Sequence, residues 1–349
     1  MKPLFARRRF FILFAFALFV LVVASACAQA SSSSDPYTLS NHSVLSPAST
    51  ETTQIKALYD FVIVIATAIF VIVEGLLVFA ILRFRNRPPE AALQVHGNTK
   101  LEIAWTTAPA IILAVLLGFT LKTMGEVRAV PTGNVLKVKA IGHQWWWEFR
   151  YPGLKPEVVT ANDLIVPLGT TVEVEVQSVD VEHGFWAPEL FGKVDAVPGY
   201  VNRLKFTPTE KVNYYGGQCT QFCGQQHAQM RFMVVVVDPA DFQTWAAHQQ
   251  QAAIPAAGDA APGEKLFVTR CGACHTVSGL AAPGVIGPSL THVATRDFIA
   301  GGILPFSPEN LKTWLHDPQA VKPGAAMVLA PPLTDQEVND LVAYLTTLK

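Results

Sequence analysis

Two long apolar segments, residues 58–82 and 101–121, constrain this chain more than any other feature of its sequence. Each is long enough to cross the hydrocarbon core of a bilayer as a helix, which takes about 20 predominantly apolar residues. The short connection between them, residues 83–100, is basic and contains Arg83, Arg85, Arg87 and Lys100. Basic loops are retained on the cytoplasmic side. The pattern therefore predicts a transmembrane hairpin, with everything after the second helix on the exported side.

An acidic residue, Glu102, stands at the cytoplasmic start of the second apolar segment. Ionisable side chains in membrane spans are costly and often functional. A carboxylate is also favoured at a helix N-terminus, where it interacts with the helix dipole. Charge placement alone favours the second interpretation, which makes Glu102 an interfacial residue.

The N-terminal residues 1–27 have the pattern of an export signal rather than of a membrane span. A basic start precedes a short apolar core and a run of small residues. Cys27 directly follows that run, and two interpretations stay open: the lipidated first residue of a bacterial lipoprotein, or an incidental cysteine near an ordinary cleavage site. Residues 28–57 then form an exported segment ahead of the first membrane helix.

The exported part divides into two regions of different pattern. Residues 134–238 alternate apolar and charged side chains in short stretches separated by Gly and Pro, which predicts a β-sandwich or barrel. Residues 239–262 begin helically and then become a linker rich in Ala, Gln and Pro, and residues 263–349 predict a small all-α domain. The fold class is a multidomain membrane protein. Its formal charge of −1 gives no support for nucleic-acid binding.

The strongest single motif is CGACH, residues 271–275. In an exported protein this pattern indicates covalent haem attachment through Cys271 and Cys274, with His275 as the axial ligand. A disulfide or half of a zinc site are the alternatives. A zinc site needs a second pair of ligands, which this region lacks, and a dithiol redox motif expects βαβ surroundings.

The sixth haem ligand is predicted to be Met327, the only methionine after His275. A Met/His pair raises the haem potential, as electron carriers require. His292 and His316 are rivals that we interpret as surface or capping residues. A ligating imidazole normally donates its second N–H to a nearby acceptor, and the carbonyl of the Gly287-Pro288 segment is the expected one.

A second cluster of soft donors lies in CTQFCGQQHAQM, residues 219–230. Its donors are Cys219, Cys223, His227 and Met230. A disulfide is the default for paired exported cysteines, but it leaves the histidine and methionine unexplained. A structural zinc leaves the thioether idle. Thiolate, imidazole and a weak Met ligand on a β-sandwich are the donors of copper electron-transfer centres, so copper is favoured.

A mononuclear copper centre needs only one cysteine, so the pair suggests two metals bridged by both thiolates. Each copper then needs a histidine, and the second must come from elsewhere in the β-region. His183 follows a predicted strand where a loop can meet the cysteines, whereas His143 lies within a strand beside three tryptophans. Spacing therefore favours His183. The Trp triplet itself, residues 145–147, indicates core packing on one face and leaves open a docking patch on the other.

Together these motifs resemble subunit II of the haem–copper cytochrome c oxidases, and the CGACH domain resembles the fused cytochrome c of the caa3 type. The resemblance covers nearly the whole mature chain. It implies a cupredoxin fold that holds the dinuclear copper centre CuA. The ligands it implies are the side chains of His183, Cys219, Cys223, His227 and Met230 and the backbone carbonyl of Gln221.

The resemblance also assigns roles that the residues alone do not. Glu102 matches the acid at the mouth of a proton path shared with subunit I, and Trp145 matches the tryptophan through which electrons enter CuA from a docked cytochrome. Asp180 and Asp195 match acidic positions around the copper domain and its contact with subunit I. The family often has Glu at the position of Gln221, where it helps to bind magnesium, so a neutral amide weakens the case for that ion.

The function implied is electron relay in the bacterial inner membrane, with the copper and haem domains on the periplasmic side. An exported cytochrome c or similar donor reduces the haem, and the electron passes through CuA to the haem of subunit I, where O2 is reduced and protons are pumped. The alternative is a membrane-tethered carrier that serves a different terminal reductase. A quinol-oxidising homologue would lack the copper ligands and is disfavoured by the two cysteines.

Overall fold

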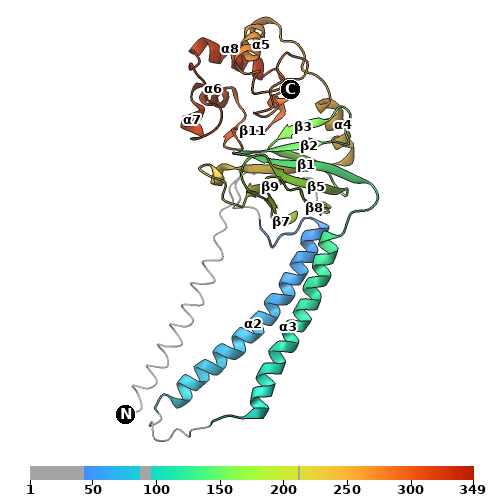
Figure 1. Cartoon of the computed structure of the whole chain (residues 1–349), viewed down its shortest axis with the longest axis vertical. Coiled ribbons are helices and arrows are strands. Elements are labelled where there is room, and N and C mark those ends of the chain that lie inside the picture. Colours follow the sequence, from blue (N-terminus) through green and yellow to red (C-terminus); the bar gives the residue numbers. More distant parts are fainter. Residues whose placement is uncertain (1–42, 87–95, 211–212) are drawn as a thin grey trace, which may run out of the picture.

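The computed structural model describes residues 43–86, 96–210 and 213–349. The predicted export signal with Cys27, the first part of the exported segment 28–57, and Arg87 of the basic loop lie outside the described residues. Three parts follow one another along the chain: two long helices, a β-sandwich and a small helical domain, with the sandwich between the other two (Figure 1).

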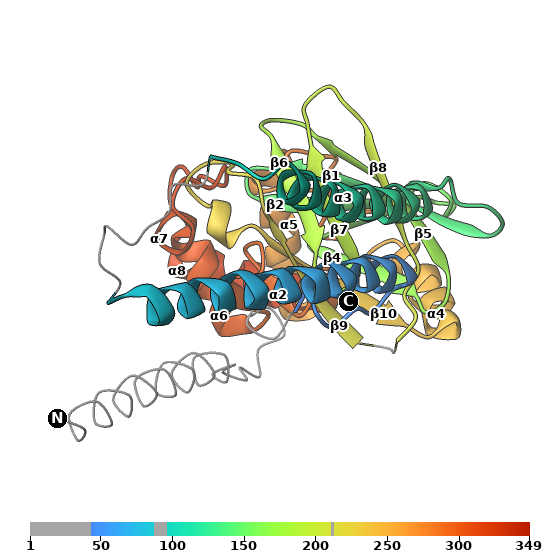
Figure 2. The ribbon, with the colours of Figure 1, turned by 90° about the horizontal axis from the view of Figure 1, so that it is seen from below.

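The two long helices are α2 (Thr50–Phe84) and α3 (Thr99–Arg128), and both are long and apolar enough to cross a membrane. Their apolar side chains are exposed on all sides, as expected for helices that face lipid. Phe61 and Phe119 pack at 5.0 Å between ring centroids. The helices diverge away from the sandwich (Figure 1) and lie next to each other beneath it (Figure 2).

The first turn of α2 is attached to the sandwich. Ser49 forms a capping box with Thr52, and its hydroxyl also donates to Leu190 O at 2.6 Å. The carboxylate of Glu51, only 3% exposed, accepts from Thr207 N at 2.9 Å and lies 3.7 Å from Lys205 Nζ. These contacts fix the direction in which the membrane helix leaves the domain.

The sandwich consists of two five-stranded sheets with the orders β3-β2-β1-β5-β8 and β4-β10-β9-β6-β7. The first contains β1 (Val135–His143), β2 (Trp146–Tyr151), β3 (Val158–Ala161), β5 (Thr171–Ser178) and β8 (Asn202–Phe206). The second contains β4 (Asp163–Pro167), β6 (His183–Ala187), β7 (Phe191–Ala196), β9 (Asn213–Cys219) and β10 (Arg231–Val237). Stacked aromatic rings fill the space between the sheets, with Phe185 and Phe232 at 4.5 Å.

A short helix, α4 (Pro239–Gln249), leads from the sandwich into the rest of the predicted linker. Trp245 packs against Tyr151 at 5.2 Å between ring centroids, and Phe242 is buried in the same place. The beginning of the segment therefore belongs to the sandwich core.

The C-terminal domain is helical. Its main helices are α5 (Ala261–Arg270), α6 (Pro308–His316), α7 (Pro318–Val321) and α8 (Asp335–Leu345), with a small hairpin of β11 (Phe298–Ile299) and β12 (Leu304–Pro305). Helices α5 and α8 cross at Gly263, where a β-carbon would lie 2.0 Å from Asp340 O. Thr334 and Glu337 form the predicted capping box of α8. The domain sits on the sandwich opposite the membrane helices (Figure 1).

Candidate metal and haem sites

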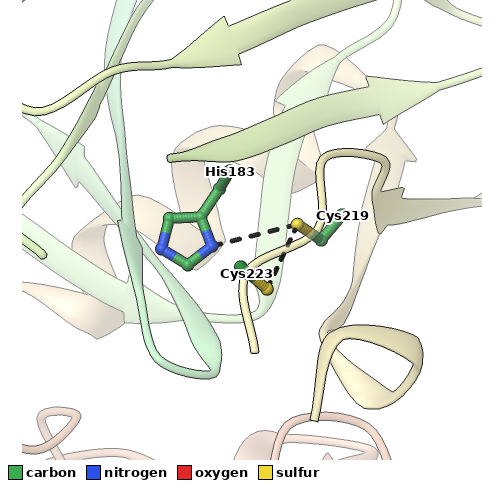
Figure 3. A group of neighbouring side chains, drawn as sticks. All are labelled: His183, Cys219 and Cys223. Atoms are coloured by element: carbon green, nitrogen blue, oxygen red, sulfur yellow. Dashed lines mark hydrogen bonds between the residues drawn. The ribbon is translucent and has the colours of Figure 1, made fainter. Parts of the chain in front are cut away.

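The predicted copper ligands come from three places in the second sheet. Cys219 ends β9, Met230 directly precedes β10, and the loop between these adjacent strands carries Cys223 and His227. Cys219 N donates to Met230 O at 2.9 Å and closes the loop. His183 begins β6, and Thr220 N donates to Gly184 O at 3.0 Å, which holds the loop against that strand. Strand pairing thus brings distant donors together (Figure 3).

The donor atoms form a continuous series. His183 Nδ1 lies 3.8 Å from Cys219 Sγ, the two Sγ atoms lie 3.7 Å apart, and His227 Nδ1 lies 3.6 Å from Cys223 Sγ. Met230 Sδ is 3.9 Å from Cys223 Sγ, and Gln221 O is 3.2 Å from Cys219 Sγ. All six predicted donors therefore gather in one cluster.

This arrangement fits copper better than the alternatives. The Sγ separation is far longer than the roughly 2.05 Å of a disulfide. A thioether beside two thiolates and two imidazoles is unusual for zinc but suits copper. Both thiols lie between the imidazoles, so each histidine has a sulfur next to it, as a centre with two bridging thiolates requires. Cys219, Cys223, Met230 and His183 are buried.

Electrostatics prepare one thiol of the pair for metal binding. The hydrogen bond from the Cys223 thiol, aided by His183 and the backbone, lowers the pKa of Cys219 despite its burial. The same pairing raises the pKa of Cys223. Proton loss is therefore favoured at Cys219 and disfavoured at Cys223, and metal binding requires both ligands in their deprotonated form.

Asp180 orients the first histidine. Its Oδ1 lies 2.8 Å from His183 Nε2, and its Oδ2 accepts from Gln144 N at 2.6 Å. Burial works to raise the pKa of the Asp180 carboxyl, but the hydrogen bonds from His183, Val181 and Gln144 hold that pKa below its usual value. The carboxylate binds Nε2 and leaves Nδ1 of the same ring directed at Cys219. The family resemblance identified Asp180 only as an acidic position near the copper domain. Its place three residues before His183 was the sequence signal that it orients this histidine.

Replacement of Asp180 by asparagine is expected to weaken copper binding by about 10- to 100-fold, because outer partners of ligating histidines contribute on this scale. An amide keeps the shape but cannot accept from both the imidazole and Gln144 N as the carboxylate does. Competition titration with a copper chelator measures the effect, and the exposed neighbour Glu182, changed to glutamine, is the matched control. Equal affinities in the two variants would contradict the assignment.

The haem-site residues surround one cavity in the C-terminal domain. Cys271, Cys274, His275 and Met327 all line it, among mainly apolar side chains. His275 Nδ1 lies 2.8 Å from Pro288 O, which confirms the predicted acceptor and leaves Nε2 available. Burial lowers the pKa of His275 against the effect of this hydrogen bond, which favours the neutral, ligating form. Two free thiols, an oriented imidazole and a thioether on an apolar cavity fit a c-type haem.

The two rival histidines lie elsewhere. His316 has a half-exposed side chain 3.7 Å from Asp335. His292, expected at the surface or as a capping residue, is buried at the N-cap of the short 3-10 helix Val293–Thr295, and its ring nitrogens lie 2.8 Å from Lys349 O and 3.1 Å from Gln251 O. Both nitrogens are thus occupied by carbonyls that tie the C-terminus to the linker.

The three tryptophans have different surroundings. Trp147 is fully buried in the sandwich core, and Trp146 stacks on His143 at 4.2 Å. His143 also lies 3.3 Å from Glu148, so it packs and pairs away from the sulfur cluster, as predicted. The indole Nε1 of Trp145 donates to Cys223 O at 2.9 Å, and the residue is only 8% exposed, with Gly324 of the C-terminal domain packed against its ring.

The remaining predicted residues lie apart from these clusters. Glu102 is in the first turn of α3, and this helix begins at its end away from the sandwich (Figure 1); the Glu102 carboxylate accepts from Asn98 N at 3.2 Å. The side chain of Gln221 accepts from Lys193 Nζ at 3.3 Å, and that ammonium also lies 3.0 Å from Asp195. A cation of the chain itself therefore faces the amide, an arrangement that does not suit a magnesium site.

These features define a class: membrane-anchored redox proteins that combine a cupredoxin-like domain with a cytochrome domain. Three family matches agree. Residues 38–122 match "Cytochrome C oxidase subunit II, transmembrane domain", residues 154–238 match the periplasmic domain of the same subunit, and residues 260–349 match "Cytochrome c". The chain belongs to the cytochrome c oxidase subunit II family and carries a C-terminal cytochrome c domain.

Curated relatives show the same similarity over most of their length. Cytochrome c oxidase subunit 2 of Alkalihalophilus pseudofirmus is 34% identical over 85% of this chain and 88% of its own. The Bacillus subtilis protein of that name is 33% identical over 78% of this chain and 82% of its own. Among solved structures, the periplasmic domain of cytochrome oxidase subunit II from Bradyrhizobium japonicum is 30% identical, covers 35% of this chain and 96% of its own, and has a TM-score of 0.33.

Proposed function

We propose that this chain relays electrons from an exported cytochrome c or similar donor, through its own haem c and a dinuclear CuA centre, to the haem of subunit I, where O2 is reduced to water with proton pumping. The observation that carries the proposal is the single cluster of six soft and carbonyl donors around Cys219 and Cys223. When bound, copper and haem supply one-electron redox chemistry.

The side chains prepare both sites for that chemistry. Cys219, Cys223, Met230, His183, His227 and the carbonyl of Gln221 would hold the copper pair, and Cys271, Cys274, His275 and Met327 would hold the haem. Asp180 and Pro288 each fix one imidazole ring by a hydrogen bond of 2.8 Å. Burial of Cys219, Cys223, Met230 and His183 keeps these donors away from water, so that little around them needs to reorganise when charge changes.

The two sites meet at Trp145. This residue lines the haem cavity and donates to Cys223 O on the copper loop, so it bridges the two sites in the fold. We assign it to electron entry into the copper centre. Glu102, in the first turn of α3, is assigned to the mouth of a proton path shared with subunit I. The two helices are assigned to the bacterial inner membrane and the other domains to the periplasmic side.

Purification of the full chain from its own membranes in mild detergent tests the proposal. We expect copper with a mixed-valence electron paramagnetic resonance signal, haem that stays on the chain under denaturing electrophoresis, and a co-purifying subunit that contains haem a. A chain with copper and haem but without a haem a partner would instead support the carrier for a different reductase. A colourless chain that contains zinc would overturn the redox function altogether.

A further inference from the structure

A buried lysine links the cytochrome domain to the copper domain. Lys322 follows α7 in the cytochrome domain and is only 4% exposed. Its Nζ donates to Trp145 O of the copper domain at 2.6 Å and to Ala300 O of its own domain at 3.1 Å. Lysine is almost never fully buried without partners, since removing its charge from water is costly. The site of Lys322 is thus a place where one ammonium group joins two domains.

The backbone on either side of Lys322 makes further contacts with the copper domain. Gln226 Nε2, next to the predicted ligand His227, donates to Pro323 O at 2.8 Å. At Gly324, where φ is +84°, a β-carbon would lie 2.8 Å from Gln225 Oε1 and 3.3 Å from Cη2 of the Trp145 ring. The absence of a side chain therefore lets residues 322–324 lie directly on the tryptophan.

This contact continues into the haem site on one side and the copper site on the other. Met327, five residues after Lys322, lines the haem cavity together with Trp145. The Trp145 indole donates to the carbonyl of Cys223. The segment from Lys322 to Met327 thus connects the contact with Trp145 to the predicted haem ligand. A rotation of the cytochrome domain would therefore move Lys322 and Met327 together relative to Trp145.

We propose that Lys322 is a positioning residue: its ammonium group locks the chain's own cytochrome domain on Trp145, and this lock sets the rate of electron transfer from haem to copper. The inference rests on the proposed relay. The lock acts on orientation more than on folding, because both of its carbonyl partners belong to loops and each domain has its own apolar core.

The cost of burial supports a role in orientation. Burial lowers the pKa of Lys322 to about 7, although the nearby Cys223 works in the opposite direction. A buried charge of this kind contributes little net stability compared with an apolar residue of similar size, but its directional hydrogen bonds can select one arrangement. The Trp145 carbonyl is available to Lys322 in the docked arrangement alone.

The test is Lys322→Met in the full chain with copper and haem in place, with Lys312→Met, on the exposed face of α6, as the matched control. Photoreduction of the haem by a small-molecule reductant, followed at the copper absorption, gives the intramolecular rate. We expect Lys322→Met to slow it by roughly tenfold or more, because a displacement of about 1 Å between reacting groups can cost as much as about 100-fold. The rate should also become dependent on solvent viscosity.

Haem potential, copper spectrum and thermal unfolding of Lys322→Met are expected to match the control, and that separates positioning from a folding role. Gly324→Ala tests the same contact from the other side and is expected to slow transfer in the same way. A rate within twofold of the control, or a slow rate accompanied by loss of haem or copper, would overturn the lock. If the proposed relay itself were wrong, the unmodified chain would show no electron transfer from haem to copper. That outcome is distinct from a failure of the lock, which appears only in the comparison of Lys322→Met with its control.

Discussion

Replacement of Cys223 by serine is expected to abolish the dinuclear copper centre while the haem stays attached. Cys223 Sγ lies at the centre of its half of the cluster, at 3.7 Å from Cys219 Sγ, 3.6 Å from His227 Nδ1 and 3.9 Å from Met230 Sδ. A hydroxyl is a hard, weakly acidic donor that cannot replace a bridging thiolate for copper. Copper affinity should fall by more than about 100-fold, the upper end of the loss caused by an outer partner alone.

The mixed-valence resonance signal and the copper content report the outcome. Cys274→Ser is the reciprocal control, since it should remove one thioether to the haem and leave both copper properties unchanged. Serine fits the position of Cys223 without new volume, so the sandwich should unfold at the same temperature as the metal-free parent. A variant at Cys223 that keeps a mixed-valence signal would show that the two thiolates do not bridge, and would leave at most a mononuclear site at Cys219.

The parts of the fold that the sequence predicted well are those set by local pattern. Apolar length alone marked the two membrane helices, because a bilayer requires an uninterrupted apolar stretch. The haem motif and the cysteine loop are each contained within a dozen neighbouring residues, so spacing alone brings their donors together. His183 was harder to assign, because it reaches the cysteine loop through the pairing of β6 with β9, in which Phe185 lies opposite Cys219.

The parts that local pattern did not reveal depend on contacts between distant segments. Lys322 stands in an ordinary Lys-Pro-Gly turn, and nothing in that turn indicates that its partner is 177 residues away. The same applies to His292, which was expected at the surface or as a cap, and whose contacts with the linker and the C-terminus could not be predicted. The Trp triplet indicated that its side chains point to opposite faces of a strand. That Trp145 is covered follows only from the position of the cytochrome domain on the sandwich.

Substitution of Met327 by leucine is expected to lower the haem midpoint potential by roughly 100 mV or more, since axial ligands tune haem potentials over about 0.8 V. Met327 lines the haem cavity with His275, and Gln319 Nε2 donates to its carbonyl at 3.1 Å, which fixes the loop that presents the thioether. Leucine keeps the apolar volume but cannot donate to iron, so the oxidised haem loses less stability than the reduced haem. Redox titration of the full chain measures the shift.

Two comparisons make this experiment specific to the sixth ligand. His316→Gln removes one of the two rival histidines, and because that side chain is half-exposed beside Asp335, the potential should not change. Copper content and the mixed-valence signal of Met327→Leu should equal those of the parent, because the copper cluster has its own thioether in Met230. If the potential stayed constant in Met327→Leu, another group would have to bind the iron. If copper were lost instead, the division of the soft donors between the two sites would be wrong.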